Sequence, residues 1–526
     1  MRSLSKSKAG KILFPLVASV VMILLVSHRL IADGDPLWAL ATGKWIVVHR
    51  AVPRVDPFSW TALGMPWVAH EWGYDLLMYL LASRLGYYGL MLLTWAGLAG
   101  FYTFLWLLCK REGKNAQITV MVFTIAVSFS GMFVAARPQV FSYFFFAAFL
   151  YLLAWRREYR WFLPVLTLFW ANLHASVVLG VIMVGFEAAM RFWFERDRSL
   201  LPVAGASFMA SLVNPNGLGL WHYAIWLSTN PWNRQIAEWR PPDFMSPVVL
   251  YPYIAVFLTL GAALYLHDRN TGNGQKTRGM VAPALYLCVF SYQAVTQVRY
   301  FPYLLVIWAV TFLRLTPEDL APPMVLEGRA GDTIRNERAS WVRHQCTPVS
   351  EKALHGPLGA SAEWTKRAAW KNLRRVEVPL ILLAMFAVWY GVVTFPGQGI
   401  AANLSPGVAP VGAVGYIETH GLTNRLFNYY TWGGYLIYEG IPVFIDGRDD
   451  VYLASTHVFQ DYVHATKLET DPDAVFRRYG VQTVLLPKNM PLTRYLEAEP
   501  QMWKEVYRGK MGEVFVNATQ VGARRT

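Results

Sequence analysis

Long apolar runs separated by short charged segments recur through most of the chain. A membrane-spanning helix needs about 20 mostly apolar residues. Runs of about that length, or slightly shorter, cover 12–30, 87–109, 116–135, 139–155, 161–173, 176–190, 199–213, 249–267, 280–297, 300–313 and 377–395. The pattern predicts a polytopic α-helical membrane protein with about 11 transmembrane helices.

The first apolar run follows several basic residues, and a cleaved signal peptide is the alternative interpretation of it. The run is longer than the apolar region of a signal peptide and lacks a small-residue cleavage site. We therefore expect a retained first helix. Residues 31–71 would then form a large outer loop, followed by an amphipathic surface helix over 72–85.

Residues 397–526 show a different pattern, in which short helical and extended segments alternate. Helices are expected over 413–419, 434–440, 473–479 and 492–498, and strands over 425–428, 443–445, 483–486 and 513–517. Such alternation predicts a small α/β domain with a partly parallel sheet. The predicted organisation is a transmembrane domain over 1–396, containing the outer region 31–85 and a cytoplasmic loop 314–376, and an exterior domain over 397–526.

Composition supports the membrane prediction. The 526 residues are 55% hydrophobic and 16% charged, with a mean hydropathy of +0.29, which excludes an ordinary soluble domain, intrinsic disorder and a disulfide scaffold. The three cysteines, Cys109, Cys288 and Cys346, lie outside the predicted exterior parts, so no structural disulfide is expected there.

The net charge of +14 comes from basic segments in alternate loops. These segments are 1–11, 110–115, 156–160, 191–198, 268–278 and 314–376. Cytoplasmic loops carry such an excess of Lys and Arg. We therefore predict a cytoplasmic (inner) membrane protein with a cytoplasmic N-terminus and a periplasmic or extracellular C-terminal domain. Nucleic-acid binding is not expected, because no basic stripe with interleaved aromatic residues occurs outside these loops.

Two carboxylates, Asp33 and Asp35, follow the first predicted helix directly, and His70 and Glu71 end the same outer loop. A carboxylate at a membrane border is costly unless it is paired or binds something. One aspartate could accept a proton from an acceptor hydroxyl while the other orients it. Alternatively the pair could form a divalent-cation site that His70 and Glu71 complete. The tryptophans of the loop are more simply explained as an interfacial aromatic belt.

These features resemble integral-membrane glycosyltransferases of the GT-C class. The segment 35–38, Asp-Pro-Leu-Trp, is similar to a motif of oligosaccharyltransferase catalytic subunits, and the acid-rich loop resembles those of protein O-mannosyltransferases and aminoarabinose transferases. Most similar is a set of uncharacterised bacterial relatives of these enzymes. The motifs shared with that set lie at 33–38, 56–61, 71–72, 170–174, 432–436 and 446–448.

The resemblance implies a polyprenyl-phosphate-linked sugar as donor and a glycan, lipid or protein of the cell envelope as acceptor on the outer face. Two departures matter. Ala39 stands where relatives often carry His, which weakens a metal proposal, and no Trp-Trp-Asp triplet occurs in the exterior domain. Transfer of a whole glycan to Asn is therefore the less favoured variant.

Other polar residues lie at predicted outer helix ends. Arg137 and Arg299 could bind the donor phosphate or simply reach the interface. His174 could contact substrate or be a packing residue, and Glu238 could position substrate or pair with Arg240. In the exterior domain, 432–435 and 444–448 predict a tight turn with an Asp–Arg pair, with sugar binding on an aromatic platform as the minority interpretation.

We therefore expect sugar transfer with Asp33 as base, Asp35 as its partner and His70 and Glu71 in support. A transporter or flippase of lipid-linked intermediates is the main alternative, because polar breaks near Asn172 and Asn214 resemble discontinuous helices. The lack of an internal repeat counts against it. A non-catalytic envelope assembly protein is the third possibility.

Overall fold

The computed structural model describes residues 10–271, 281–316, 399–404, 407–455 and 457–518. The expected span over 377–395, Cys346 and nearly all of the expected cytoplasmic loop lie outside the described residues.

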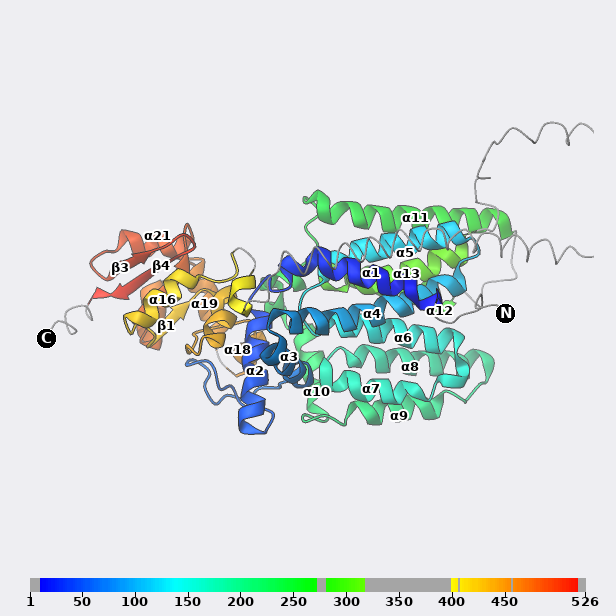
Figure 1. Cartoon of the computed structure of the whole chain (residues 1–526), viewed down its shortest axis with the longest axis horizontal. Helices are drawn as coiled ribbons and strands as arrows, with labels where there is room; N and C mark the ends of the chain where they lie inside the picture. Colours follow the sequence, from blue (N-terminus) through cyan, green and yellow to red (C-terminus); the bar gives the residue numbers. More distant parts are fainter. Residues whose placement is uncertain (1–9, 272–280, 317–398, 405–406, 456, 519–526) are drawn as a thin grey trace, which may run out of the picture.

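Long helices lie side by side and form the larger part of the molecule (Figure 1). They are α1 (Gly10–Val26), α4 (Tyr87–Glu112), α5 (Ala116–Ser130), α6 (Gln139–Trp155), α7 (Phe162–Leu173), α8 (Val177–Met190), α9 (Leu201–Ser211), α11 (Pro247–Thr271), α12 (Val281–Thr296) and α13 (Phe301–Leu315). Helix α4 packs against α1 and α6, and α13 packs against α5, α11 and α12.

Five helical segments among the described residues are long and apolar enough to cross a membrane. These segments are Tyr87–Glu112, Ala116–Phe133, Val177–Glu195, Pro247–Tyr265 and Val298–Leu315. The predicted polytopic membrane protein is confirmed, and the count of 11 spans stays a prediction. Large exposed apolar side chains cover the outside of these helices, as a lipid-facing surface requires.

Helices α2 (Asp35–His49) and α3 (Trp72–Leu85) lie at the end of the bundle that faces the C-terminal domain (Figure 1). The expected surface helix is α3, which packs against α2. Helix α2 falls in a stretch expected to be loop. Apolar residues lie on nearly all sides of this segment, so its pattern does not indicate an amphipathic surface helix. The segment is also too short for a membrane-spanning helix. A side chain at Gly43 would collide with the backbone of Asp75, so glycine permits this close packing.

The C-terminal domain contains one four-stranded sheet. Its order is β1 (Leu426–Asn428), β2 (Thr483–Pro487), β4 (Gly512–Asn517) and β3 (Trp503–Arg508). The β1–β2 pair is parallel and the other pairs are antiparallel, which confirms a partly parallel sheet. Helices of the domain are α16 (Val411–Thr419), α17 (Gly433–Tyr438), α18 (Asp449–Ser455), α19 (Val458–Thr466), α20 (Pro472–Tyr479) and α21 (Pro491–Ala498).

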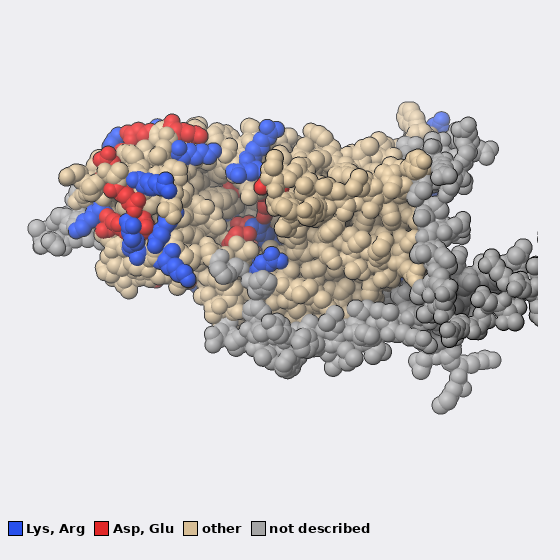
Figure 2. Space-filling model, turned by 90° about the horizontal axis from the view of Figure 1, so that it is seen from above, with Lys and Arg blue, Asp and Glu red and all other residues tan. Residues whose placement is uncertain are grey.

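The strand expected over 443–445 is wrong. Val443 makes only an isolated bridge to Ser59 of the outer loop, so this segment attaches the loop to the domain instead of joining the sheet. Strand β3 was not expected, because its apolar and polar residues do not alternate over its whole length. In Figure 2, charged side chains gather on the domain and around a hollow between domain and bundle, whereas the visible bundle surface is almost free of them.

Candidate active site between the bundle and the C-terminal domain

A cavity of about 690 Å³ lies where the bundle, the start of α2 and the C-terminal domain meet. We call it the polar cavity. Every candidate site residue of the sequence analysis lines it: Asp33, Asp35, His70, Glu71, Arg137, His174, Glu238 and Arg299. The structure thus brings together side chains that are up to 266 positions apart in the chain.

Arg137 is the centre of one group, which we call the carboxylate cluster. Its Nη2 donates to Asp33 Oδ2 and lies 3.0 Å from Asp35 Oδ2, and its Nη1 donates to Glu238 Oε1. Within the described part of the chain, Glu238 forms no ion pair with Arg240, which instead donates to backbone carbonyl oxygens. Arg137 therefore holds three carboxylates from two separate segments at one wall of the cavity.

Local backbone structure fixes the two aspartates. The Asp35 backbone N–H donates to Asp33 Oδ1 at 3.0 Å, and Trp38 Nε1 donates to Asp35 Oδ1 at 3.2 Å. Pro36 in the first turn of α2 is favourable at a helix start. The backbone of Gly34 lies against that of Gly434, where neither residue has room for a side chain.

Burial raises the pKa of Asp35 to about 8. Arg137 opposes this effect, and the neighbouring carboxylates of Asp33 and Glu238 add to it. Asp35 is therefore protonated at neutral pH. One guanidinium cannot offset three carboxylates in a buried place, so the cluster retains a proton.

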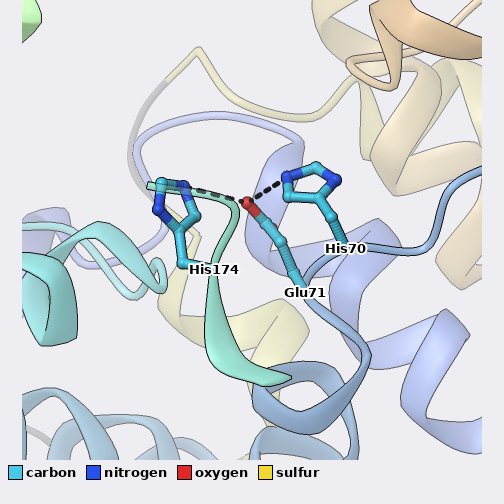
Figure 3. A group of neighbouring side chains, drawn as sticks. All are labelled: His70, Glu71 and His174. Carbon is cyan, nitrogen blue, oxygen red and sulfur yellow. Dashed lines mark hydrogen bonds and ion pairs between the residues drawn. The ribbon is translucent and has the colours of Figure 1, made fainter. Parts of the chain in front are cut away.

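A second group, the histidine cluster, contains His70, Glu71 and His174 (Figure 3). Glu71 Oε1 lies 3.0 Å from His70 Nε2 and 3.5 Å from His174 Nε2. The contact of Trp72 Nε1 with Asn172 Oδ1 at 3.1 Å joins the start of α3 to the end of α7 and so brings these residues together.

The two histidines have opposite pKa shifts. Burial lowers the pKa of His174 to about 3, so its ring is neutral. Burial would also lower the pKa of His70, but the Glu71 carboxylate outweighs it and raises the pKa above the ordinary value. The Ser176 hydroxyl lies 2.6 Å from His174 Nδ1, which fixes the ring and leaves Nε2 toward Glu71.

The ligand atoms of the histidine cluster lie within 4.8 Å of one another, a spacing that suits a single metal ion. Two imidazoles and one carboxylate are ligands that zinc accepts. The sequence suggested a cation between Asp33, Asp35, His70 and Glu71. Among the described residues, the metal-competent group includes His70 and Glu71 but neither aspartate.

Arg299 lies apart from both clusters. Its guanidinium lies 4.2 Å from the centre of the Trp239 ring, and no carboxylate of the described residues is within salt-bridge distance of it. It lines the polar cavity and also an adjoining cavity of about 650 Å³. Apart from Arg29, the charged residues of this second cavity also line the polar cavity, and the rest of its wall includes helix side chains such as Phe133, Val178, Ile182 and Phe290. We call it the apolar cavity after these helix side chains.

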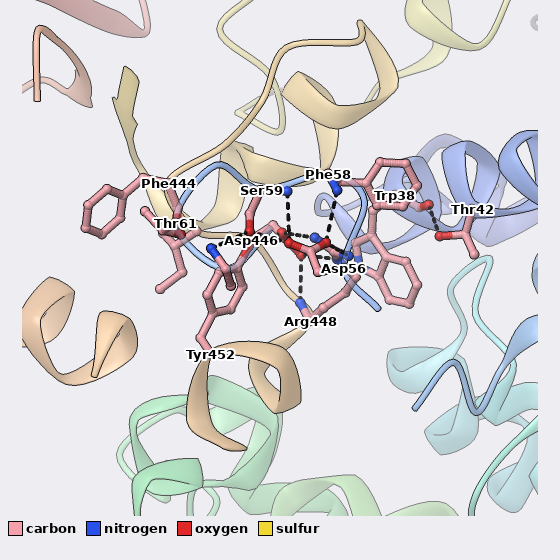
Figure 4. A network of polar contacts seen from close by, with 12 residues as sticks. Trp38, Thr42, Asp56, Phe58, Ser59, Thr61, Phe444, Asp446, Arg448 and Tyr452 are labelled. Carbon is pink, nitrogen blue, oxygen red and sulfur yellow. Dashed lines mark hydrogen bonds and ion pairs between the residues drawn. The ribbon is translucent and has the colours of Figure 1, made fainter. Parts of the chain in front are cut away.

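A buried ion network joins the outer loop to the domain (Figure 4). Arg448 Nη1 lies 2.6 Å from Asp56 Oδ1, and Arg448 Nη2 lies 2.6 Å from Asp446 Oδ2. Tyr452 also donates to Asp446, and Asp56 accepts from the Ser59 backbone at 3.0 Å. The expected Asp–Arg pair at 446–448 is confirmed, with Asp56 as an additional partner.

Sequence reasoning missed three further acids that line the polar cavity: Asp75, Asp449 and Asp450. Burial raises the pKa of all three, and that of Asp450 to about 6. The Tyr430 hydroxyl donates to Asp449 Oδ1. A signal was available, because Asp449 and Asp450 begin a helix directly after the Asp-Gly-Arg turn.

No protein-family model matches the chain, and no curated protein matches its sequence. Solved structures do match its fold. The Archaeoglobus fulgidus oligosaccharyltransferase, tethered with an acceptor peptide containing the NVT sequon, is 11% identical and has a TM-score of 0.51, with 96% of this chain and 74% of that one covered.

The archaeal oligosaccharyltransferase AglB of the same organism, in complex with an inhibitory peptide and a dolichol-phosphate, has a TM-score of 0.50 at 11% identity and the same coverage. ArnT from Cupriavidus metallidurans is 15% identical over 98% of this chain and 99% of that one, at a lower TM-score of 0.44. The oligosaccharyltransferase matches confirm the predicted resemblance to the GT-C fold.

Proposed function

We propose that this protein transfers a sugar from a polyprenyl-phosphate-linked donor to an acceptor on the outer face of the cytoplasmic membrane. One observation carries the proposal. The polar cavity that contains Asp33 shares Arg299 and the carboxylate cluster residues Asp33, Arg137 and Glu238 with the apolar cavity. The charged sugar-phosphate part of such a donor would lie in the polar cavity, and its apolar polyprenyl chain would lie in the apolar cavity.

In this scheme the acceptor hydroxyl oxygen attacks the sugar carbon that bears the phosphate. A new bond forms between these two atoms, and the bond from that carbon to the phosphate oxygen breaks. The phosphate leaves with the electron pair, and the hydroxyl proton passes to the Asp33 carboxylate. Asp35, already protonated, adds no charge that would oppose departure of the phosphate.

The arginines have different parts in the scheme. Arg299 would bind the donor phosphate, because its guanidinium has no carboxylate partner among the described residues. Arg137 would act mainly by positioning Asp33, Asp35 and Glu238, and its predicted contact with phosphate stays a prediction. The histidine cluster would hold a divalent cation beside the acceptor.

The test uses the purified full chain in liposomes with polyprenyl-phosphate-linked pentoses and hexoses and an extract of envelope glycans, lipids and proteins. We expect release of polyprenyl phosphate together with sugar on an acceptor, and loss of both by about 10²–10⁴-fold in Asp33→Asn. Asp243 is exposed and lines neither cavity, so Asp243→Asn provides a matched control.

Full transfer by an Asp33→Asn/Asp35→Asn double variant would contradict the proposal. Movement of the labelled donor across the liposome membrane without transfer would instead favour the flippase alternative.

A further inference from the structure

We call the end of the bundle opposite the C-terminal domain the far end (Figure 1). A third cavity lies there. Its volume is about 530 Å³, and none of its lining residues belongs to the polar or the apolar cavity. The walls come from α4, α6, α8, α12 and α13 and from η5 (Arg191–Glu195), a π-helical turn after α8. Such turns occur often at functional sites.

Two ion pairs occupy the walls of this far-end cavity. Arg314 binds Glu112 through two nitrogens, at 3.0 and 2.6 Å, and Arg191 Nε lies 2.7 Å from Glu187 Oε1. Burying charged groups among apolar side chains is costly unless they are paired or bind a ligand.

Some polar atoms of the cavity lining take no part in these two ion pairs. Arg191 is 7% exposed, and its Nη1 is buried without a hydrogen-bond partner among the described residues. The Tyr286 hydroxyl is likewise buried and has no partner in that part of the chain. Two donors without acceptors therefore belong to the cavity lining, and a buried donor without an acceptor destabilises the fold unless a ligand accepts from it.

An unpaired carboxylate completes the set. Glu195 lines the same cavity, is exposed and forms no ion pair within the described residues. The lining therefore has one more carboxylate than guanidinium, since Glu112, Glu187 and Glu195 face Arg191 and Arg314. That balance disfavours a purely anionic ligand and favours one that carries a cation as well.

The surroundings place the cavity at the level of lipid head groups. Trp161 and Trp193, at the same end of the bundle, are 60% and 73% exposed, as in the aromatic belts at membrane interfaces. Apolar side chains such as Leu150, Leu153 and Val310 line the cavity beside the polar ones. An amphipathic ligand matches this lining.

We propose that the far-end cavity binds a zwitterionic aminophospholipid, that is, a phosphodiester with a primary ammonium on its head group. The phosphodiester accepts from Arg191 and from the Tyr286 hydroxyl, and the ammonium pairs with Glu195. The start of the acyl chains lies along the apolar side chains. This site is independent of the sugar-transfer proposal, so either can fail without the other.

The experiment is native mass spectrometry of the delipidated full chain with phosphatidylethanolamine, phosphatidylglycerol or soluble phosphoethanolamine. We expect one phosphatidylethanolamine to bind about tenfold more tightly than phosphatidylglycerol, because only the former offers the ammonium. Tyr286→Phe and Glu195→Gln should each weaken its binding by about five- to tenfold. Glu195→Gln should also remove the preference over phosphatidylglycerol.

Control variants are Tyr265→Phe, on the exposed side of α11, and Glu158→Gln, at an exposed position of the far end. Thermal unfolding verifies that all four variants are folded. Equal binding of both lipids, or equal effects of cavity and control variants, would overturn the proposal. Equal competition by soluble phosphoethanolamine would show a water-soluble ligand and overturn it as well.

Discussion

Gly447 of the C-terminal domain lies directly against Asp35 at the start of α2. A Cβ at Gly447 would collide with Asp35 Oδ1 and would lie 3.4 Å from Trp38 Nε1. The same Asp35 oxygen accepts from that indole N–H at 3.2 Å. The backbone of the C-terminal domain at Gly447 therefore packs against the Asp35 side chain.

Gly447→Ala should reduce sugar transfer by about tenfold or more without unfolding the protein, because the methyl group displaces the Asp35 carboxylate from Trp38 and Arg137. Transfer rate and thermal unfolding are the measurements. Gly415→Ala is the matched control, since a Cβ there meets nothing within 4 Å. Unchanged transfer by Gly447→Ala would show that the position of Asp35 does not matter.

The raised pKa of Asp35 predicts a pH dependence of donor binding. Below about pH 8 Asp35 is protonated, and above it the carboxylate adds one negative charge to the polar cavity that would receive the donor phosphate. The KM for the donor should therefore rise on the order of tenfold as the pH passes 8. Steady-state kinetics between pH 6 and pH 10 measure it.

Asp35→Asn keeps the shape of the side chain but cannot ionise. Its KM should lack the rise near pH 8, whereas Asp243→Asn should retain it. A rise of the same size in Asp35→Asn would assign the titration to another group.

Helix positions were predictable because each depends on its own segment. The helix α6, expected over 139–155, is Gln139–Trp155, and α3 begins and ends where its pattern indicated. Apolar runs of this length are costly in any other conformation within a membrane. Helix α2 was missed because the domain covers its outer side, which no local pattern reveals.

The sequence singled out eight residues that line one cavity in the structure, but it did not indicate which of them contact each other. Asp33 and Arg137 are 104 positions apart, and Arg448 and Asp56 are 392 apart. Spacing along the chain carries no information on such pairs, because the tertiary packing of α6 and of the domain creates them. The expected cation site was for this reason assigned to residues of a single outer loop, whereas in the structure His174, from outside that loop, joins His70 and Glu71.

Arg448→Met should destabilise the attachment of the outer loop to the domain by about 3–5 kcal/mol, because two buried carboxylates lose their cation. Thermal unfolding and proteolytic release of the domain report it. Arg477→Met, which removes an exposed pair with Asp471 at 3.4 Å, should change stability by less than about 1 kcal/mol. Similar effects of the two variants would exclude a stabilising role of the buried network.

The histidine cluster should bind one zinc ion per chain. Elemental analysis after dialysis should show loss of this ion in Glu71→Gln and His174→Ala. The ion should be retained in His222→Ala, whose imidazole is exposed on α10 (Gly219–Thr229). Protons compete with the metal for His70, so affinity should fall as the pH drops through the raised pKa of that residue. Equal metal content in all variants would place the ion elsewhere.

Arg299→Ala should raise the KM for the lipid-linked donor by about 10- to 100-fold and change kcat less, because an unpaired guanidinium is a strong ligand for a phosphate. Arg299→Lys should recover only part of the loss, since an ammonium cannot bind two phosphate oxygens side by side or stack as well on Trp239. Arg234→Ala is the control, because Arg234 is exposed and lines neither cavity of the proposed active site. If Arg299→Ala lowered kcat alone, the guanidinium would act in the transition state and not in donor binding. If neither KM nor kcat changed, Arg299 would not belong to the active site.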